Sequence, residues 1–306
     1  MLLLTLTLPI TLPVAAIMTL FASTRGAVAT LLFILGYLWC EVIGLLSALW
    51  IRLRCFQPDR YALANYRLQY WWASALKRLA ERLFRLRFVI SGEDALTDGA
   101  AIVFPRHTSI ADTIIPIVFF AAPYDLQLRY VLKQELLLDP CLDIVGNRIP
   151  NLFVDRSGQD SDAARRDVAA LTRSLYDGQG LVIYPEGTRH SPPKRQRLNE
   201  RYRDNSEMQA QLRRWPSLLP PRLGGTMAVL AANPGRDIVF CAHHGFEGSS
   251  HFRELINGSW LNARIQLEFW RVPYSAVPKQ DDQQREFMFA QWDEMQRRVH
   301  AMETAA

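Results

Sequence analysis

Apolar residues fill the first fifty positions of the chain almost without a break. Residues 2–22 carry no charge, and residues 27–50 carry only that of Glu41. Each run reaches the ~20 residues that a helix needs to cross a bilayer. We therefore predict that residues 1–54 form a membrane anchor, in which the two runs make a transmembrane helical hairpin.

Two other interpretations of these runs are a cleaved signal peptide and a pair of buried helices in a soluble protein. A signal peptide begins with basic residues and has an apolar stretch of about 7–15 residues. Residues 2–22 form a longer stretch that follows no basic residue, and the second run starts too late in the chain. A membrane anchor therefore remains our prediction, with buried soluble helices as the alternative.

Basic residues beside the second run indicate the side of the membrane on which the rest of the chain lies. Between residues 52 and 88 there are nine Lys or Arg and two acidic residues, whereas the loop between the two runs has only Arg25. Basic residues that flank a membrane segment stay in the cytoplasm. We expect the remaining chain on the cytoplasmic face of a bacterial inner membrane.

Residues 55–88 have the pattern of an amphipathic helix. Apolar residues recur at helical spacing, Arg and Lys occupy another face, and Tyr70, Trp71 and Trp72 lie at the middle. Basic amphipathic helices with aromatic residues bind at the headgroup boundary of a membrane. We predict such an interfacial helix here; the alternative is an ordinary helix packed on the domain, with a solvated basic face.

After residue 88 the pattern changes to short strands that alternate with helices. Segments rich in apolar and β-branched residues are predicted strands, at 87–92, 100–105, 128–133, 151–155, 180–184, 237–242 and 264–270. Helical spacing predicts helices at 109–122, 160–176, 227–232 and 283–302. Such alternation is typical of an α/β sheet. The polar, basic stretch 190–223 is interpreted as an excursion from this sheet, partly helical.

Titratable and charged residues follow three of the predicted strands, and at one of them, 151–155, Arg156 comes directly after Asp155. His107 comes directly after 100–105, and Asp112 lies five residues further on, close enough for its carboxylate to fix the tautomer of the histidine. Glu186-Gly187-Thr188-Arg189 follows 180–184, with an arginine fork suited to phosphate and a glycine that allows close approach. Because ligand sites of α/β sheets collect at the carboxyl ends of strands, we expect these residues to lie near one another.

The motifs HTSIAD, FVDR and YPEGTR, in this order and with these spacings, resemble the first three motifs of the 1-acylglycerol-3-phosphate acyltransferases. The resemblance covers about residues 85–300. LLPPRLGG and the basic stretch before it resemble the longer branch of lysophospholipid acyltransferases, which also carries an N-terminal hydrophobic anchor. The resemblance implies a glycerol-3-phosphate acyltransferase-like domain in residues 89–306, with a mixed sheet flanked by helices.

The resemblance also implies a reaction: transfer of a fatty acyl group from acyl-CoA or acyl carrier protein to the free hydroxyl of a lysophospholipid. The expected acceptor is 1-acyl-sn-glycerol 3-phosphate, which gives phosphatidic acid. His107 would take the proton of the hydroxyl, and Asp112 would orient the imidazole. The residues expected to hold or shape the site of the acceptor phosphate are Glu186, Gly187, Thr188, Arg189 and Arg156.

Two departures from the family pattern affect the surroundings of this site. Arg106 stands where the family usually has asparagine, and IVFCAHHGF replaces an apolar strand that usually ends in proline. The second departure leaves the identity of the acceptor open. Residues that could line the pocket are Arg106, Phe153, Asp155 and His243, with a structural role as the alternative for His243.

Cysteine and histidine spacing give no sign of a metal site. The four cysteines are scattered without a CxxC pair, and no histidines have metal-ligand spacing. We therefore predict no metal and no cofactor, with the acyl donor acting as a substrate. Apart from one basic face, nothing in the sequence suggests nucleic acid binding. The expected partners are membrane lipids and the two substrates, with no obligate protein partner.

Three alternatives to this function remain. The acceptor could be a lysophospholipid with a larger headgroup, since the motifs describe the chemistry better than the acceptor. The chain could be a non-catalytic membrane protein that binds lipid. This is disfavoured because the key residues of the His-x4-Asp and EGTR motifs are all present, namely His107, Asp112, Glu186 and Arg189. A soluble hydrolase in which His107 activates water is the third, and the apolar residues before 51 disfavour it.

Overall fold

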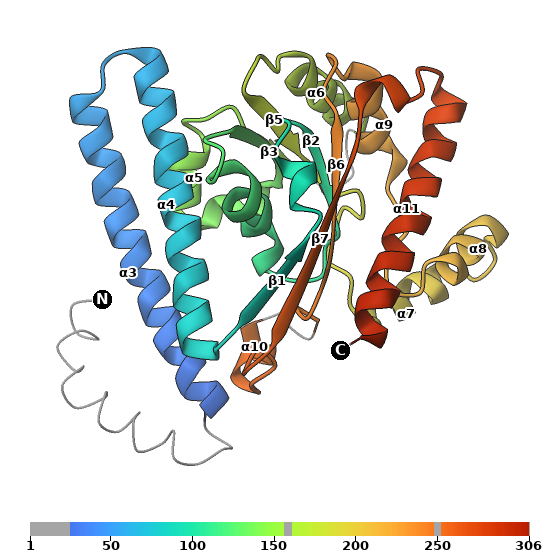
Figure 1. Cartoon of the computed structure of the whole chain (residues 1–306), viewed down its shortest axis with the longest axis horizontal. Helices are drawn as coiled ribbons and strands as arrows, with labels where there is room; N and C mark the ends of the chain where they lie inside the picture. The colour runs from blue at the N-terminus through green and yellow to red at the C-terminus, as the bar shows by residue number, and fades with distance from the viewer. Residues whose placement is uncertain (1–24, 156–160, 248–251, 306) are drawn as a thin grey trace.

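The structure is a computed structural model that describes residues 25–155, 161–247 and 252–305. The first apolar run, residues 2–22, and Arg156 lie outside the described residues. The second run forms helix α3 (Arg25–Arg54), which pairs with α4 (Pro58–Phe84) at one side of an α/β domain (Figure 1). The domain continues from there to α11 (Asp281–Thr304).

The centre of the domain is a single mixed β-sheet. Its strands are β1 (Arg87–Ser91), β2 (Ile102–Pro105), β3 (Gln127–Lys133), β4 (Leu152–Val154), β5 (Gln179–Val182), β6 (Ile238–His244) and β7 (Arg264–Val272). They lie in the order β1-β7-β6-β2-β5-β3-β4, and paired strands are parallel except β6 and β7. The predicted α/β fold with a mixed sheet and flanking helices is confirmed.

Alternate side chains of β2 enter the two hydrophobic cores, one on each face of the sheet. Ile102 and Phe104 pack in a core that includes Trp292 of α11, whereas Val103 packs in a core that includes Phe84 of α4. The first core also contains buried residues of α6 (Ser161–Arg173) and α9 (Leu223–Ala232). Helices therefore cover both faces, and β2 lies between two buried layers.

The helices α3 and α4 are antiparallel and pack side by side (Figure 1). Proline in the first turn of α4 and a left-handed residue at its end, Arg85 with φ 56°, fix the bounds of that helix. Glu41, the one charge of the apolar run, accepts hydrogen bonds from Trp72 Nε1 at 2.8 Å and from the backbone nitrogen of Cys141 at 3.0 Å. The carboxylate therefore points into the protein and links three helices, including α5 (Pro140–Gly146).

The opposite side of α3 is apolar and exposed. α3 is the one helix among the described residues that is long and apolar enough to cross a membrane. Its exposed large apolar side chains are Leu31, Ile34, Trp39, Ile43, Leu46, Leu49, Trp50 and Leu53. They recur at helical spacing, so one continuous stripe of α3 faces away from the domain.

Several elements differ from their prediction. Residues 109–122 form no regular α-helix but a 3₁₀ turn (Ala111–Ile114) and a π turn (Ile117–Ala121). In α4 the central Tyr70 is buried, and its hydroxyl donates to the carbonyl oxygen of Leu126, so this aromatic residue packs on the domain. The basic excursion is partly helical, as predicted, and contains α7 (Pro192–Arg201) and α8 (Ser206–Arg214).

Candidate active site

Neighbouring strands bring the predicted motifs to one edge of the sheet. β2 pairs in parallel with both β5 and β6, so the residues after these three strands lie close together. Gly180 lets β2 and β5 approach, because a Cβ there would lie 2.3 Å from the carbonyl oxygen of Ala101. His107 and Glu186 follow the first two strands, and His243 lies at the end of the third.

The His107–Asp112 pair forms as expected. Asp112 Oδ2 lies 3.1 Å from His107 Nδ1 and also accepts hydrogen bonds from the backbone nitrogens of Thr108 at 2.5 Å and Ser109 at 2.7 Å. This arrangement places the proton of the neutral imidazole on Nδ1 and leaves Nε2 unprotonated. His107 lines a cavity, whereas Asp112 is fully buried. The pair thus has the geometry of a base and its orienting carboxylate.

The surroundings of Asp112 favour its ionised form. Burial alone would raise the pKa of this carboxyl, but His243, His107 and the backbone N–H of Ser109 outweigh that effect and hold the pKa below its usual value. His243 Nε2 lies 3.6 Å from the second carboxylate oxygen, Oδ1, whereas His107 contacts Oδ2. Asp112 is therefore placed between two imidazole rings.

Glu186 joins the two motifs rather than pointing into the cavity. It is buried, and its Oε1 accepts from the backbone nitrogen of His107 at 2.7 Å, while Oε2 accepts from that of Leu219 at 3.0 Å. Burial raises the pKa of Glu186 to about 8, although both backbone N–H groups act in the opposite direction. A second link is the hydrogen bond from the His190 backbone nitrogen to the carbonyl oxygen of His107, at 2.6 Å.

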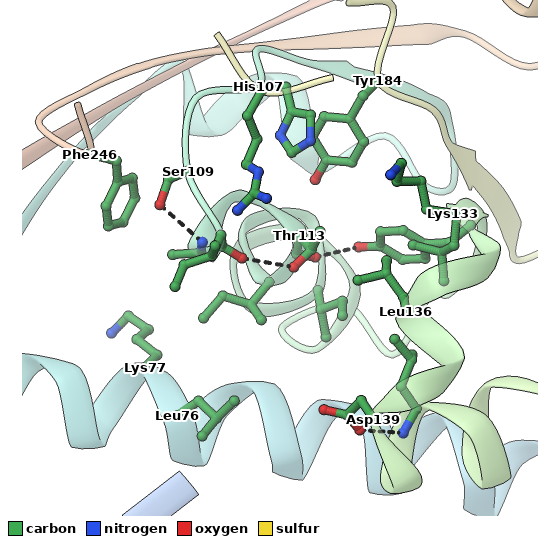
Figure 2. Close-up of a pocket in the computed structure, with 18 of the residues that line it drawn as sticks. Leu76, Lys77, His107, Ser109, Thr113, Lys133, Leu136, Asp139, Tyr184 and Phe246 are labelled. Carbon is green, nitrogen blue, oxygen red and sulfur yellow. Dashed lines mark hydrogen bonds between the residues drawn. The ribbon is translucent and has the colours of Figure 1, made fainter. Parts of the chain in front are cut away.

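Tyr184 also supports the histidine. Its ring centroid lies 4.5 Å from that of His107, and its hydroxyl donates to the backbone carbonyl of Asp112 at 2.8 Å. Figure 2 shows the two rings side by side at one end of the cavity. Tyr184 precedes the EGTR motif in the sequence, so it too is positioned by the end of β5.

Gly187 and Arg222 are packed against each other. Gly187 has φ +66°, and a Cβ at this position would lie 2.6 Å from Arg222 Cδ. Only a residue without a side chain allows the arginine to lie over the turn. The neighbouring Thr188 and Arg189 line the cavity. The EGTR turn thus gathers hydroxyl and guanidinium groups near His107, which suits a phosphate.

Arg106 precedes His107 in the sequence but does not line the cavity. Its side chain is 1% exposed and donates to the carbonyl oxygens of His243 at 2.5 Å and Ser217 at 2.8 Å and to Glu247 Oε1 at 2.5 Å. Its own carbonyl oxygen accepts from His243 Nε2 at 3.0 Å. The pocket position predicted for Arg106 is therefore not observed, and His243 has the structural role that was its alternative: both side chains are buried, and their hydrogen bonds connect the end of β2 to β6.

The cavity beside His107 has a volume of about 690 Å³. Its apolar part lies between α4 and the irregular segment after Asp112, and its lining includes Leu76, Ile110, Ile114 and Leu142. Figure 2 shows Leu76 at the end opposite His107. Basic residues also line the cavity: Lys77 lies beside Leu76 (Figure 2), and the others are Lys133, Arg189, Lys194 and Arg197.

The remaining predicted residues lie further from His107. Phe153 is half-buried and packs near Gly146, and neither it nor Asp155 is among the residues that line the cavity. Sequence reasoning did not single out Tyr184, Lys133, Lys194, Arg197 or Arg222 as site residues. Tyr184 belongs to the motif YPEGTR and Arg222 to LLPPRLGG. Membership of these motifs was the one feature of the sequence that could have indicated a place in the site.

Comparisons relate the chain to a protein family and to solved structures. A family model described as Acyltransferase matches residues 87–242, about half of the chain. Among solved structures, the chain is similar to the crystal structure of the 1-acyl-sn-glycerophosphate (LPA) acyltransferase PlsC from Thermotoga maritima, with a TM-score of 0.63 and 14% sequence identity. The match covers 91% of this chain and 96% of that one, and at this identity it shows a shared fold.

Proposed function

Because the chain belongs to the acyltransferase family, we propose that it transfers a fatty acyl group from a thioester donor to the free hydroxyl of a lysophospholipid. We propose 1-acyl-sn-glycerol 3-phosphate as the acceptor and phosphatidic acid as the product. The observation that carries this proposal is the His107–Asp112 pair beside a cavity whose lining is mostly apolar and includes Thr188 and Arg189 of the EGTR turn.

The transfer requires no nucleophilic side chain from the protein. His107 Nε2 removes the proton of the acceptor hydroxyl as its oxygen attacks the thioester carbonyl carbon. Asp112 holds Nδ1 and stabilises the imidazolium that forms. When the tetrahedral intermediate collapses, the carbon–sulfur bond breaks, and the leaving thiolate takes the proton back from His107. The products are the new ester and the free thiol, with His107 neutral again.

The EGTR turn supports binding of the acceptor phosphate. In 1-acyl-sn-glycerol 3-phosphate the reacting hydroxyl and the phosphate are on adjacent carbons, so the phosphate must lie close to His107. Arg189 and Thr188 line the cavity there, and Arg222 lies over Gly187. Guanidinium groups bind phosphate through paired, charge-assisted hydrogen bonds. Glu186 has a positioning role in this account, since both its oxygens bind backbone nitrogens.

The apolar part of the cavity supports binding of an acyl chain. Its walls come from α4, the segment after Asp112 and α5, and α3, whose outer stripe is apolar, packs against α4. We propose that this stripe embeds in the membrane, on the cytoplasmic side, so that lipid substrates reach the cavity from the bilayer. Sedimentation of the protein with liposomes, and its release by detergent but not by high salt, tests this part.

A panel of lysolipids tests the acceptor directly. The purified protein is assayed with one acyl-CoA and equal concentrations of lysophosphatidic acid and of lysolipids with glycerol, ethanolamine or choline headgroups, and release of free CoA is measured. We expect the highest kcat/KM with lysophosphatidic acid, whose phosphomonoester carries a charge of about −1.5 to −2 at pH 7. A preference for a phosphodiester headgroup would contradict the proposed acceptor, and no thiol release with any of them would contradict acyl transfer.

A further inference from the structure

The two departures from the family pattern, Arg106 and the segment that contains His243, are in direct contact. The guanidinium group of Arg106 donates to the backbone carbonyl of His243 at 2.5 Å, and His243 Nε2 lies 3.0 Å from the carbonyl oxygen of Arg106. Each side chain thus binds the backbone of the other residue, where β2 and β6 run side by side (Figure 1). The positions of the two side chains are therefore set together.

This contact fixes the protonation of His243. A carbonyl oxygen only accepts hydrogen bonds, so Nε2 carries the hydrogen. Nδ1 is buried and has no hydrogen-bond partner among the described residues, so a second proton there would be buried without an acceptor. Burial lowers the pKa of His243, and the charge of Arg106 acts in the same direction, against the opposite effect of Asp112. His243 is therefore a neutral ring whose one N–H is at Nε2.

The same N–H lies close to Asp112. His243 Nε2 is 3.6 Å from Oδ1, the carboxylate oxygen that has no hydrogen-bond partner among the described residues. Oδ2, in contrast, contacts His107 and two backbone nitrogens. Both side chains are fully buried, where the interaction between a dipole and a charge is stronger than in water. The positive end of the imidazole N–H therefore acts on the oxygen that lacks another donor.

The other titratable groups around Asp112 do not replace this contact. Burial raises the pKa of Tyr184 and of Cys241, so both are neutral at pH 7. The Tyr184 hydroxyl donates to the backbone carbonyl of Asp112 and not to its carboxylate. Glu186 binds backbone nitrogens with both of its oxygens. His243 is thus the side chain that can stabilise the charge at Oδ1.

The charged groups on the remaining sides of His243 are paired with one another. Glu247 Oε1 accepts from Arg106 at 2.5 Å, and Glu247 Oε2 lies 3.3 Å from His244 Nδ1. Among the described residues, Asp112 is the one carboxylate within 4.0 Å of a ring nitrogen of His243. The imidazole of His243 is therefore directed at the carboxylate that orients the base.

We propose that His243 is a positioning residue for the base: its Nε2–H stabilises the carboxylate of Asp112 at Oδ1, which keeps that carboxylate ionised and His107 Nε2 free of a proton. The inference rests on the proposed function in that His107 Nε2 must be unprotonated to accept the proton of the hydroxyl. It goes beyond that function by giving a residue outside the cavity an effect on the reaction, and by assigning one role to both departures from the family pattern.

The direction of the expected effect follows from the shared carboxylate. Without the N–H at Nε2, the negative charge of Asp112 is stabilised less, so the His107–Asp112 pair takes up a proton at a higher pH. Activity should then be lost at a higher pH on the acid side of the profile. The loss of one hydrogen bond corresponds to a shift of about 0.5 to 1 pH unit.

Three substitutions of His243 in the full-length protein test this effect. His243→Gln places an amide N–H near the position of Nε2 and should keep the wild-type profile. His243→Leu has a similar volume but no donor, and in His243→Asn the donor is too short to reach Asp112 Oδ1. We expect the Leu and Asn variants to move the acid-side midpoint of kcat/KM upward by about 0.5 to 1 pH unit and to lower kcat roughly three- to tenfold. KM should change less than about twofold, since His243 does not line the cavity.

His244→Leu is the matched control, because the neighbouring ring on β6 contacts Glu247 and not Asp112. It should leave the acid-side midpoint unchanged. The inference is overturned if neither the Leu nor the Asn variant of His243 moves the midpoint, if His243→Gln moves it equally, or if His244→Leu has the same effect. If a melting curve shows that His243→Leu is unfolded, the comparison of the Asn and Gln variants decides the question by the same criteria.

Titration of the imidazole signals separates this inference from the proposed function. The ring resonance of His107, assigned by its loss in His107→Ala, is followed by NMR across a pH series in ¹³C-labelled protein without substrate. Its midpoint should be higher in His243→Leu than in wild type, and this difference should vanish when both proteins also carry Asp112→Asn.

The two claims then fail under different results. If the NMR difference is found and no lysolipid supports thiol release, the proposed acyl transfer fails and the positioning role of His243 stands. If thiol is released but the NMR difference is absent, or persists with Asp112→Asn, the positioning role fails and the proposed function stands.

Discussion

Glu186 Oε1 accepts a hydrogen bond from the backbone nitrogen of His107 at 2.7 Å, across 79 residues of sequence. This bond joins the loop after β2 to the EGTR turn after β5. Glu186 is therefore bound to the backbone of the loop that carries His107, and it does not line the cavity. One turn therefore positions both His107, the proposed base, and the residues proposed to bind the acceptor phosphate.

The negative charge of Asp112 is expected to be essential. Asp112→Asn retains an oxygen acceptor for Thr108 and Ser109 but removes the charge that stabilises the His107 imidazolium. We predict a fall in kcat of about 10²- to 10⁴-fold, because general-base catalysis by His107, which contributes a factor of that size, depends on this carboxylate. Steady-state assays with a melting curve for each protein check this. A variant that keeps more than a tenth of the wild-type kcat would contradict the role of Asp112.

Arg189 should act on the acceptor alone. Arg189→Ala removes a cavity-lining guanidinium from the proposed phosphate site. We expect KM for lysophosphatidic acid to rise roughly 10- to 100-fold, as for the loss of a hydrogen bond between charged groups, with little change in KM for acyl-CoA. Arg173→Ala, an exposed arginine at the end of α6, is the control. Equal effects of the two variants would remove Arg189 from the site.

The depth of the cavity should set the preferred acyl chain. Leu76→Trp adds volume at the end opposite His107 (Figure 2). We predict a shift of kcat/KM toward shorter acyl-CoA chains, measured across a series from decanoyl to stearoyl. Leu46→Trp, on the exposed stripe of α3, should leave the series unchanged. An unaltered preference in Leu76→Trp would mean that the acyl chain lies elsewhere.

Stability should depend on pH through Glu247. Arg106, His243 and His244 hold the pKa of this carboxyl well below its usual value, against the effect of burial. A group whose pKa is depressed on folding stabilises the protein above its unfolded-state pKa, about 4.3, and that contribution is lost as the pH falls toward the folded-state pKa. Glu247→Gln should therefore lower Tm at pH 7, and the difference from wild type should shrink below about pH 4. A constant Tm difference from pH 7 to pH 3 would contradict this.

Much of the fold followed from local pattern. The apolar run 27–50 forms most of α3, and each predicted strand has a counterpart in the sheet. These elements were predictable because the apolar pattern that defines each of them lies within a short stretch of sequence. The helix predicted at 109–122 failed for a local reason. Asp112 Oδ2 takes the backbone N–H groups of Thr108 and Ser109, so the chain turns tightly around the carboxylate instead of starting an α-helix.

The sequence predicted the site residues that directly follow strands. It did not predict those whose position depends on tertiary packing. His107, Asp112 and the EGTR turn come together because β2 and β5 are adjacent. Arg222 lies over the EGTR turn because Gly187 has no side chain in its way. Lys194 lines the cavity because α7 is held in place by the hydrogen bonds of Arg195. Arg106 looked like a pocket residue from its place beside His107, yet partners more than 100 residues away turn it into the interior. Such contacts depend on tertiary structure and leave no periodic signal.

Removal of the imidazole of His107 tests the central claim most directly. His107→Ala should reduce thiol release from acyl-CoA in the presence of lysophosphatidic acid at least about 10³-fold, within the range for loss of a general base, while Tm and liposome binding stay near wild type. His300→Ala, which removes an imidazole that is exposed on α11, should retain full activity. Activity of the folded His107→Ala protein equal to that of His300→Ala would contradict the account.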